Sequence, residues 1–500
     1  MGRMTVDGTN HAEQPGNSRW DRAFFGHPRG LSTLFFTEMW ERFSYYGMRA
    51  ILILFMTASI EKGGLGFPTS KAGAIYGFYT AMVYLLSLPG GWLADRITGQ
   101  RKTVLLGGAI IALGHFAMAF PSLETFYLGL ALIVFGTGML KPNVSTMVGQ
   151  LYSKNDARRD AGFSIFYMGI NLGAFISPLV CGYLGENINW HYGFGAAGVG
   201  MTCGLIQYAL GEKYLGKAGL ERSGTAADFQ LLRRVLIGTG VVVIAALAAS
   251  FAGLFTFSAE GLANGFGLVL AVIMVVFFVW LLTAKGYTPR ERKAFWAILV
   301  LFIASSLFWS VYEQAGSTLN LFAERNTNLH QWDFPLWGLF RASYYQSVKS
   351  LFIISLAPAF AWLWLKLGKR EPSSTAKFAW GLVLVGLSFA ILVPVAGGTN
   401  VSPWWLVLTY LLQTMGELCL SPVGLSATTK LAPARIAGLM MGVFFASIAV
   451  GNYIGGQLAS VYESFPLPML FGIVGAFATV AGILMVFLLR PMKGLMGEVN

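Results

Sequence analysis

Charged residues are scarce in this chain. Asp, Glu, Lys and Arg make up 12% of its 500 residues, about half of the roughly 25% that is usual in soluble domains. Hydrophobic residues make up 55%, and the mean hydropathy is +0.61. Several apolar runs exceed the roughly 18 residues that a helix needs to cross a bilayer. The composition therefore excludes a soluble globular protein and predicts an all-α polytopic membrane protein.

Cysteine and histidine are scarce as well. Cys181, Cys203 and Cys419 lie in separate apolar runs at unrelated spacings, which argues against a disulfide framework or a zinc motif. The five histidines are scattered, and only His115 lies deep in an apolar run, as a packed neutral ring would. The chain has no HExxH motif, CxxC pair or P-loop. We therefore predict neither an enzyme nor a bound cofactor or metal.

Acidic residues are fewer than basic ones, 23 against 35, so that the net charge is +12. In a soluble protein this excess would suggest a nucleic-acid partner. Here about 27 of the 35 basic residues lie in the termini and in every second loop between apolar runs. The positive-inside rule places such loops, and therefore both termini, in the cytoplasm. No nucleic-acid partner is predicted.

Fourteen apolar segments are expected to cross the membrane. The first set of six is 31–58, 71–94, 103–120, 126–149, 161–185 and 191–211. Two strongly apolar segments follow, 230–255 and 261–284. The second set of six is 294–322, 344–366, 378–395, 404–429, 437–459 and 467–489. This order predicts 12 helices in two six-helix bundles around a central cavity, with an inserted lipid-facing pair.

Polar stretches divide the chain at the ends of these sets. Residues 1–30 have no apolar signal-peptide core and are expected to form a cytoplasmic tail. The expected parts are the tail 1–30, a first bundle at 31–212, a linker with the inserted pair at 213–292, a second bundle at 293–490 and a cytoplasmic tail at 491–500.

A charged stripe in the first segment is the most unusual feature of the sequence. At about 100° per residue, one arc of the helix carries Glu38, Glu41, Arg42, Tyr45 and Arg49, with Tyr46 at its edge. Four charges near the midplane cost on the order of 10 kcal/mol before pairing, so the stripe is expected to face a watery cavity. The alternative is a local ion pair, since Glu38 and Arg42 are four residues apart, but Arg49 has no acidic partner nearby in the sequence.

Two polar residues interrupt apolar segments of the first half. Lys141 precedes Pro142 within a segment, where it either faces the cavity or extends to the helix end. Asn171 shares a helix face with Ser164 and Tyr167. That face suits either a ligand or hydrogen bonds between helices.

Two carboxylates lie within apolar segments of the second half. Glu313 shares a helix face with Trp309 and Ser317, and Glu417 shares one with Ser421. A carboxylate that is paired when ionised and unpaired when protonated is what proton coupling requires. A purely structural salt bridge is the alternative for each.

The loop after the second segment reads Gly-Gly-x-x-x-Asp-Arg-x-x-Gly-x-Arg-Lys, ending at Lys102. It resembles the loop between the second and third helices of the major facilitator superfamily. The resemblance implies a latch on the cytoplasmic face that involves Asp95, Arg96 and Arg101. An ordinary positive-inside loop is the alternative.

The whole chain resembles the proton-dependent oligopeptide transporter family, a branch of that superfamily. The most specific mark is the ExxER stretch at Glu38–Arg42 with the following Phe-Ser-Tyr-Tyr-Gly-Met-Arg. The stretches Phe163–Gly173 and Gly416-Glu-Leu-Cys-Leu-Ser-Pro-Val-Gly-Leu are similar to two more. The likeness runs from about residue 30 to 490, and the inserted pair is similar to that of bacterial members. It implies a monomer in the bacterial inner membrane that imports di- and tripeptides with protons.

The resemblance implies proton-coupling roles for residues of both bundles. Glu38, Glu41 and Arg42 would couple protons to peptide binding. Arg49 and Glu313 would form a bridge between the bundles that protonation opens.

The resemblance also implies a substrate site. Arg42 and Lys141 would hold the peptide carboxylate, and Glu417 with Asn171 would hold its amino terminus. The other expected members of the site are Arg49, Tyr45, Tyr46, Tyr84, Trp309, Ser421 and Lys349.

Lys349 is a departure from the family pattern. Family members usually carry Gln-Ser-Leu-Asn-Pro where this chain has Gln346-Ser-Val-Lys349-Ser350. The lysine replaces an asparagine that is expected to contact the peptide. It could compete for Glu417 or Glu313, or favour substrates with acidic side chains.

The residues support the same function without the resemblance. A zwitterionic peptide needs a cationic pole, supplied by Arg42, Arg49 and Lys141, and an anionic pole, supplied by Glu313 and Glu417. We therefore predict a proton-coupled peptide symporter that works by alternating access. Transport of another solute, such as nitrate, a peptidomimetic or a drug, is the first alternative. A membrane receptor or enzyme is the second.

Overall fold

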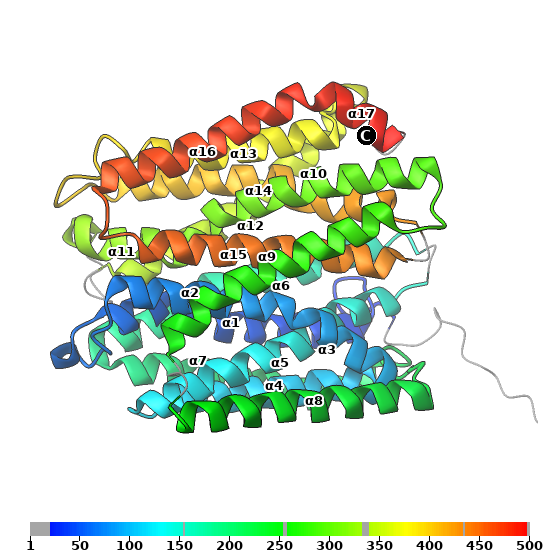
Figure 1. The fold of residues 1–500 in the computed structure, drawn as a ribbon, viewed down its shortest axis with the longest axis horizontal. Helices are drawn as coiled ribbons and strands as arrows, with labels where there is room; N and C mark the ends of the chain where they lie inside the picture. The colour runs from blue at the N-terminus through cyan, green and yellow to red at the C-terminus, as the bar shows by residue number, and fades with distance from the viewer. Residues whose placement is uncertain (1–20, 154–155, 254–257, 333–339, 434–435, 498–500) are drawn as a thin grey trace, which may run out of the picture.

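The computed structural model describes residues 21–153, 156–253, 258–332, 340–433 and 436–497, and it consists almost entirely of helices (Figure 1). Most of the expected N-terminal tail and the last three residues of the C-terminal tail lie outside the described residues. Ten helical stretches are long and apolar enough to cross a membrane. Four further helices, α1 (Arg29–Thr57), α4 (Gln100–Met118), α7 (Trp190–Gly211) and α13 (Ser374–Ala390), complete the fourteen segments that the sequence predicts.

The first bundle is built around α1, which is buried along most of its length against α6 and α7. Its remaining helices are α2 (Thr69–Leu85), α3 (Ser87–Leu93), α5 (Leu123–Gln150) and α6 (Arg159–Tyr183). α4 packs between α5 and α7. A helix that carries four charges in apolar surroundings is stable only where neighbours supply partners for them. The central place of α1 provides those neighbours.

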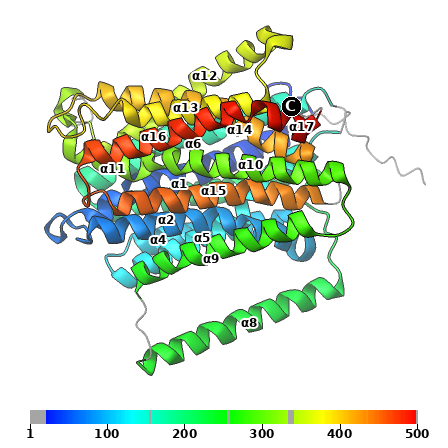
Figure 2. The same ribbon diagram turned by 45° about the horizontal axis from the view of Figure 1, so that its top comes forward.

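The inserted pair is α8 (Ala226–Phe251) and α9 (Ala259–Thr283). α8 lies clear of both bundles (Figure 2), and none of its apolar window is buried. α9 packs against α2 and α15 (Ala437–Ser460): the ring centroids of Phe266 and Tyr453 are 5.6 Å apart, and the Tyr453 hydroxyl donates a hydrogen bond to the Asn264 carbonyl. The apolar part of α8 is therefore exposed all round, and α9 is exposed over most of its surface, with 17% of its apolar window buried.

The second bundle begins at α10 (Pro289–Tyr312), which starts with Pro289 at N1 and a capping box of Thr288 and Glu291. The other helices are α11 (Thr318–Asn326), α12 (Tyr345–Leu367), α13, α14 (Trp404–Leu431), α15, α16 (Leu467–Phe487) and the short α17 (Leu489–Met496). The sequence predicts one continuous helix at 294–322. Instead a 3₁₀ turn at Glu313–Gly316 separates α10 from α11. Ser317 therefore does not share a helix face with Trp309 and Glu313, although the sequence predicts that it does.

The two bundles meet along α2 and α15 and along α6 and α12. Near the end of α15 the backbones touch: a Cβ atom on Gly456 would lie 2.2 Å from the Cα atom of Gly77. A Cβ atom on Gly73 would lie 2.4 Å from the Ser460 nitrogen. Only glycine allows two helices to approach this closely. We call this contact, made by Gly73 and Gly77 with Gly456 and Ser460, the glycine seam.

An ion pair lies beside the glycine seam. Arg325 Nη1 is 2.6 Å from Glu463 Oε1, and the same carboxylate accepts a hydrogen bond of 2.5 Å from Thr69 of the first bundle. The bonds from Thr69 and Arg325 hold the pKa of Glu463 below its ordinary value. The carboxylate is half exposed, and an exposed pair contributes only about 0–1 kcal/mol. Packing at the glycine seam therefore dominates the contact between the bundles at this face.

The glycine seam predicts a strong effect of one methyl group. Gly456→Ala places a Cβ atom against the Gly77 backbone, which overpacks the contact by about 1–3 kcal/mol. We expect the melting temperature in detergent, measured by differential scanning fluorimetry, to fall by several degrees. Gly240→Ala is the matched control, because a Cβ atom there meets nothing within 4 Å. Equal melting temperatures for the two variants would contradict the seam.

Candidate functional site

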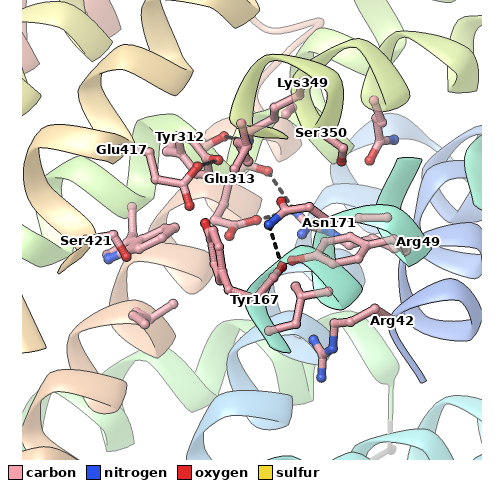
Figure 3. Close-up of a pocket in the computed structure, with 18 of the residues that line it drawn as sticks. Arg42, Arg49, Tyr167, Asn171, Tyr312, Glu313, Lys349, Ser350, Glu417 and Ser421 are labelled. Carbon is pink, nitrogen blue, oxygen red and sulfur yellow. Dashed lines mark hydrogen bonds and ion pairs between the residues drawn. The ribbon is translucent and has the colours of Figure 1, made fainter. Parts of the chain in front are cut away.

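A cavity of about 350 Å³ lies between the two bundles and is lined by side chains from both (Figure 3). This volume is within the range of small-ligand sites, roughly 300–1,000 Å³. The lining includes twelve of the residues that the sequence analysis selected: Glu38, Arg42, Tyr46, Arg49, Tyr84, Lys141, Asn171, Trp309, Glu313, Lys349, Glu417 and Ser421. Residues far apart in the chain are thus brought to one place.

The charged stripe of α1 forms a closed triad around one guanidinium. The Nε atom of Arg42 lies 3.0 Å from Glu38 Oε1 and 2.5 Å from Glu41 Oε2. All three side chains are at most 3% exposed. Two carboxylates share one cation, so the triad carries a formal charge of −1 when both are ionised. Glu38 and Arg42 line the cavity, whereas Glu41 lies behind them.

A second ion pair crosses from one bundle to the other. Arg49 of α1 pairs with Glu313 at the break between α10 and α11. Its Nη2 atom also donates to the Glu313 carbonyl at 3.2 Å, and its Nε atom donates to the Tyr76 hydroxyl at 2.6 Å. Nearby, the amide of Asn320 donates to the Ala50 carbonyl at 2.7 Å. The helix break thus places the carboxylate and the carbonyl of Glu313 toward the same guanidinium.

Tyr312 links the acidic and basic groups of the second bundle. Its hydroxyl donates a hydrogen bond to Glu417 of α14. Lys349 of α12 lies over the Tyr312 ring, with Nζ 3.1 Å from the centroid, and donates to the Tyr312 carbonyl at 3.4 Å. Trp309 packs edge-on against the same ring at 5.1 Å. Figure 3 shows Lys349, Tyr312 and Glu417 on one side of the pocket, with Arg42 across from them.

The first bundle contributes Lys141 and Asn171 to the cavity. Lys141 lies well inside α5, and its Nζ atom is 3.7 Å from the centroid of the Tyr84 ring, a cation–π distance. It therefore faces the cavity and does not extend to the helix end. The Asn171 amide nitrogen donates to the Tyr167 carbonyl of its own helix at 2.9 Å. This bond leaves the amide oxygen of Asn171 for a ligand.

One expected contact residue lies elsewhere. Tyr45 is 1% exposed and does not line the cavity. Its ring packs against Tyr46 at 5.3 Å and lies 5.4 Å from the Arg42 guanidinium. The cavity lies on the side of the arc that ends at Tyr46, so Tyr45 packs inside the first bundle.

The three residues of the expected latch bind the chain that follows α7. Arg101 donates to the carbonyls of Ala218 at 2.7 Å and Gly216 at 2.6 Å. Arg96 lies 3.8 Å from Asp228 at the start of α8, and the Asp95 carbonyl accepts a bond of 2.9 Å from the Ser223 nitrogen. In this structure the loop therefore holds the linker to the inserted pair.

Tyr312 and Tyr76 are members of the site that the sequence analysis did not select. Each holds a charged group by its hydroxyl, Glu417 and Arg49 respectively. Tyr312 directly precedes Glu313 and lies three residues after Trp309, so helical spacing from Trp309 could have identified it. Tyr76 lies on α2 with no charged neighbour in sequence, and only the fold brings it to Arg49.

The sequence is similar to that of known transporters along most of its length. A profile of the POT family (PTR2) matches residues 101–474. "Uncharacterized transporter YclF" of Bacillus subtilis is 45% identical over 487 residues, which cover 95% of this chain and 97% of that protein. A "Di-/tripeptide transporter" of Lactococcus lactis is 41% identical, with 97% and 99% covered.

Solved transporter structures are similar to this chain in fold as well as in sequence. A crystal structure of the peptide transporter POT in complex with sulfate has a TM-score of 0.89 at 45% identity and covers 95% of this chain and 97% of that one. A POT family transporter in complex with 5-aminolevulinic acid has a TM-score of 0.88 at 37% identity, with 95% and 98% covered. The chain therefore belongs to the POT family of membrane peptide transporters, which have the major facilitator fold, and it is a transporter and not an enzyme.

Proposed function

We propose that this protein imports di- and tripeptides together with protons across the bacterial inner membrane. The observation that carries the proposal is a cavity between two bundles whose charged lining residues come from both. Relatives at 41% and 38% identity are named "Di-/tripeptide transporter" and "Peptide transporter YePEPT". A peptide with opposite charges at its ends can contact both bundles at once, which couples its binding to their movement.

The peptide carboxylate is held by Lys141 with help from Arg42. Arg42 already has two carboxylates beside it, Glu38 and Glu41. Among the ion pairs of the described residues none includes Lys141, whose ammonium contacts the Tyr84 ring. An incoming carboxylate therefore meets less competition at Lys141 than at Arg42. The peptide ammonium is held on the other side by Glu417 and by the amide oxygen of Asn171.

Protons act on two carboxylate–guanidinium groups. In the triad, a proton on Glu38 or Glu41 leaves one carboxylate for Arg42, so the guanidinium is freer to bind the peptide. In the bridge, a proton on Glu313 removes the only carboxylate that contacts Arg49 among the described residues. Loss of this ion pair between bundles favours their separation. Proton entry at the bridge and peptide entry in the cavity are thus coupled through α1.

The protein works by alternating access as a monomer with cytoplasmic termini. The glycine seam and the Arg325–Glu463 pair lie where α1 ends and α2 begins. With the termini in the cytoplasm, this face is the outer one. The structure then corresponds to a state in which the outer face is closed.

We expect Glu417→Gln to weaken dialanine binding at least about ten-fold, because it removes a charge-assisted bond to the ammonium of roughly 1.5–3 kcal/mol. Microscale thermophoresis on the purified protein measures the affinity. Glu61→Gln, at an exposed position of the 3₁₀ turn Ile60–Lys62, is the matched control. Near-normal affinity in Glu417→Gln would rule out its role. If the native protein bound nitrate and no dipeptide, transport of another solute would replace peptide transport.

We expect Glu313→Gln to separate exchange from accumulation. The substituted side chain cannot bind or release a proton, but the reconstituted protein should still exchange external labelled dialanine for unlabelled dialanine held inside the liposomes. It should lose accumulation driven by an inward proton gradient. Both rates are measured on the same proteoliposomes, with Glu61→Gln as control. Full accumulation in Glu313→Gln would show that the proton binds elsewhere.

A further inference from the structure

Some of the charged side chains that line the cavity have an ion-pair partner, and others have none among the described residues. Arg42 is paired with Glu38 and Glu41, and Arg49 is paired with Glu313. Among the ion pairs of the described residues none includes Lys141, Lys349 or Glu417, although all three line the cavity. The cavity charges without an ion-pair partner among the described residues are therefore two cations and one anion, whereas the triad around Arg42 has one carboxylate more than it has guanidiniums.

Lys349 and Glu417 form no direct ion pair with each other in this arrangement. The aromatic ring of Tyr312 lies under the Lys349 ammonium at 3.1 Å, and the Tyr312 hydroxyl is bonded to Glu417. The ammonium has a single carbonyl, that of Tyr312 at 3.4 Å, as its hydrogen-bond acceptor. An ammonium has three donors. Lys349 therefore retains donors that can reach an acceptor in the cavity.

A neutral zwitterionic peptide leaves one of the two lysines without a direct ion-pair partner. Its carboxylate neutralises Lys141 and its ammonium neutralises Glu417, but nothing on the peptide matches Lys349. A peptide with an acidic side chain carries two carboxylates and one ammonium. That pattern is the complement of the two cations and one anion.

The positions of the three groups decide which residue of the peptide is acidic. Lys349 and Glu417 both contact Tyr312 of the second bundle, whereas Lys141 lies on α5 of the first bundle. The second carboxylate must therefore lie close to the peptide ammonium and far from the terminal carboxylate. Only an acidic residue at the first position of the peptide meets both conditions.

We propose that the protein prefers peptides that begin with Asp or Glu, and that Lys349 determines this specificity by binding the acidic side chain. This inference rests on the proposed function, since it uses the placement of the peptide termini at Lys141 and Glu417. In this inference Lys349 of the second bundle gives the peptide a second cationic contact besides Lys141.

The test is equilibrium binding of three dipeptides, Asp-Ala, Asn-Ala and Ala-Asp, to the purified full chain by microscale thermophoresis, with dialanine as reference. We expect Asp-Ala to bind about ten-fold more tightly than Asn-Ala, the value of one charge-assisted contact. Ala-Asp should lack most of this advantage. Equal affinities for Asp-Ala and Asn-Ala, with dialanine bound, would overturn the inference and leave the proposed function intact. Binding of none of the four would overturn both.

Variants assign the preference to its residue. In Lys349→Gln the ratio of the Asp-Ala and Asn-Ala affinities should fall to about one, whereas Lys349→Arg should retain a ratio well above one. Lys366→Gln is the matched control on the same helix, because Lys366 is exposed and contacts Trp362. An unchanged ratio in Lys349→Gln would show that another group binds the side chain. If that variant fails to fold, the comparison of Asp-Ala with Asn-Ala and Ala-Asp in the native protein still decides the preference for an acidic first residue, and loss of the ratio in Lys349→Arg would overturn the role of Lys349.

Discussion

The architecture depends on keeping ionised side chains in apolar surroundings without leaving them unpaired. An isolated buried charge costs several kcal/mol, and removing one member of a buried pair costs about 3–5 kcal/mol. α1 carries Glu38, Glu41, Arg42 and Arg49, and three of them satisfy one another within the helix. Arg49 finds its carboxylate only on the other bundle. One helix therefore needs the second bundle for its own electrostatic stability.

Close packing and ion pairing stabilise different parts of the interface between the bundles. At the face where α1 ends, helices approach so closely that only glycine fits, and the exposed ion pair there adds little. Deeper in the interface, the contact is polar and passes through Arg49, Glu313 and the Asn320 amide. A tight apolar contact can form and separate without changing charge. In the proposed mechanism the polar contact changes with the ionisation of Glu313, which would make the movement of the bundles depend on a proton.

Much of this arrangement could be predicted from the sequence, because membrane helices follow from apolar runs whatever their tertiary partners. Apolar runs gave the fourteen segments, and helical periodicity gave the charged stripe of α1. The convergence of Lys141, Glu313 and Glu417 followed from the presence of charged residues within apolar segments. The interruption at Glu313 was not predicted, although Gly316 and Ser317 follow it in the sequence, because the break positions the carboxylate and the carbonyl of Glu313 toward the distant Arg49. The inward packing of Tyr45 was also missed, because helical periodicity gives a direction and not the identity of the neighbour. The hydroxyl contacts of Tyr312 and Tyr76 depend on residues far away in the chain, and no local pattern records them.

The break between α10 and α11 has a consequence for how a proton and a movement are connected. At most positions of a helix, a side chain can change its charge while the backbone stays the same. At Glu313 the carboxylate and its own carbonyl both bind Arg49, at the point where the helical hydrogen bonds change from one register to another. The residue that we propose to receive the proton is thus also the place where the chain bends. Under that proposal, a change in the ionisation of Glu313 would act directly on the angle between α10 and α11.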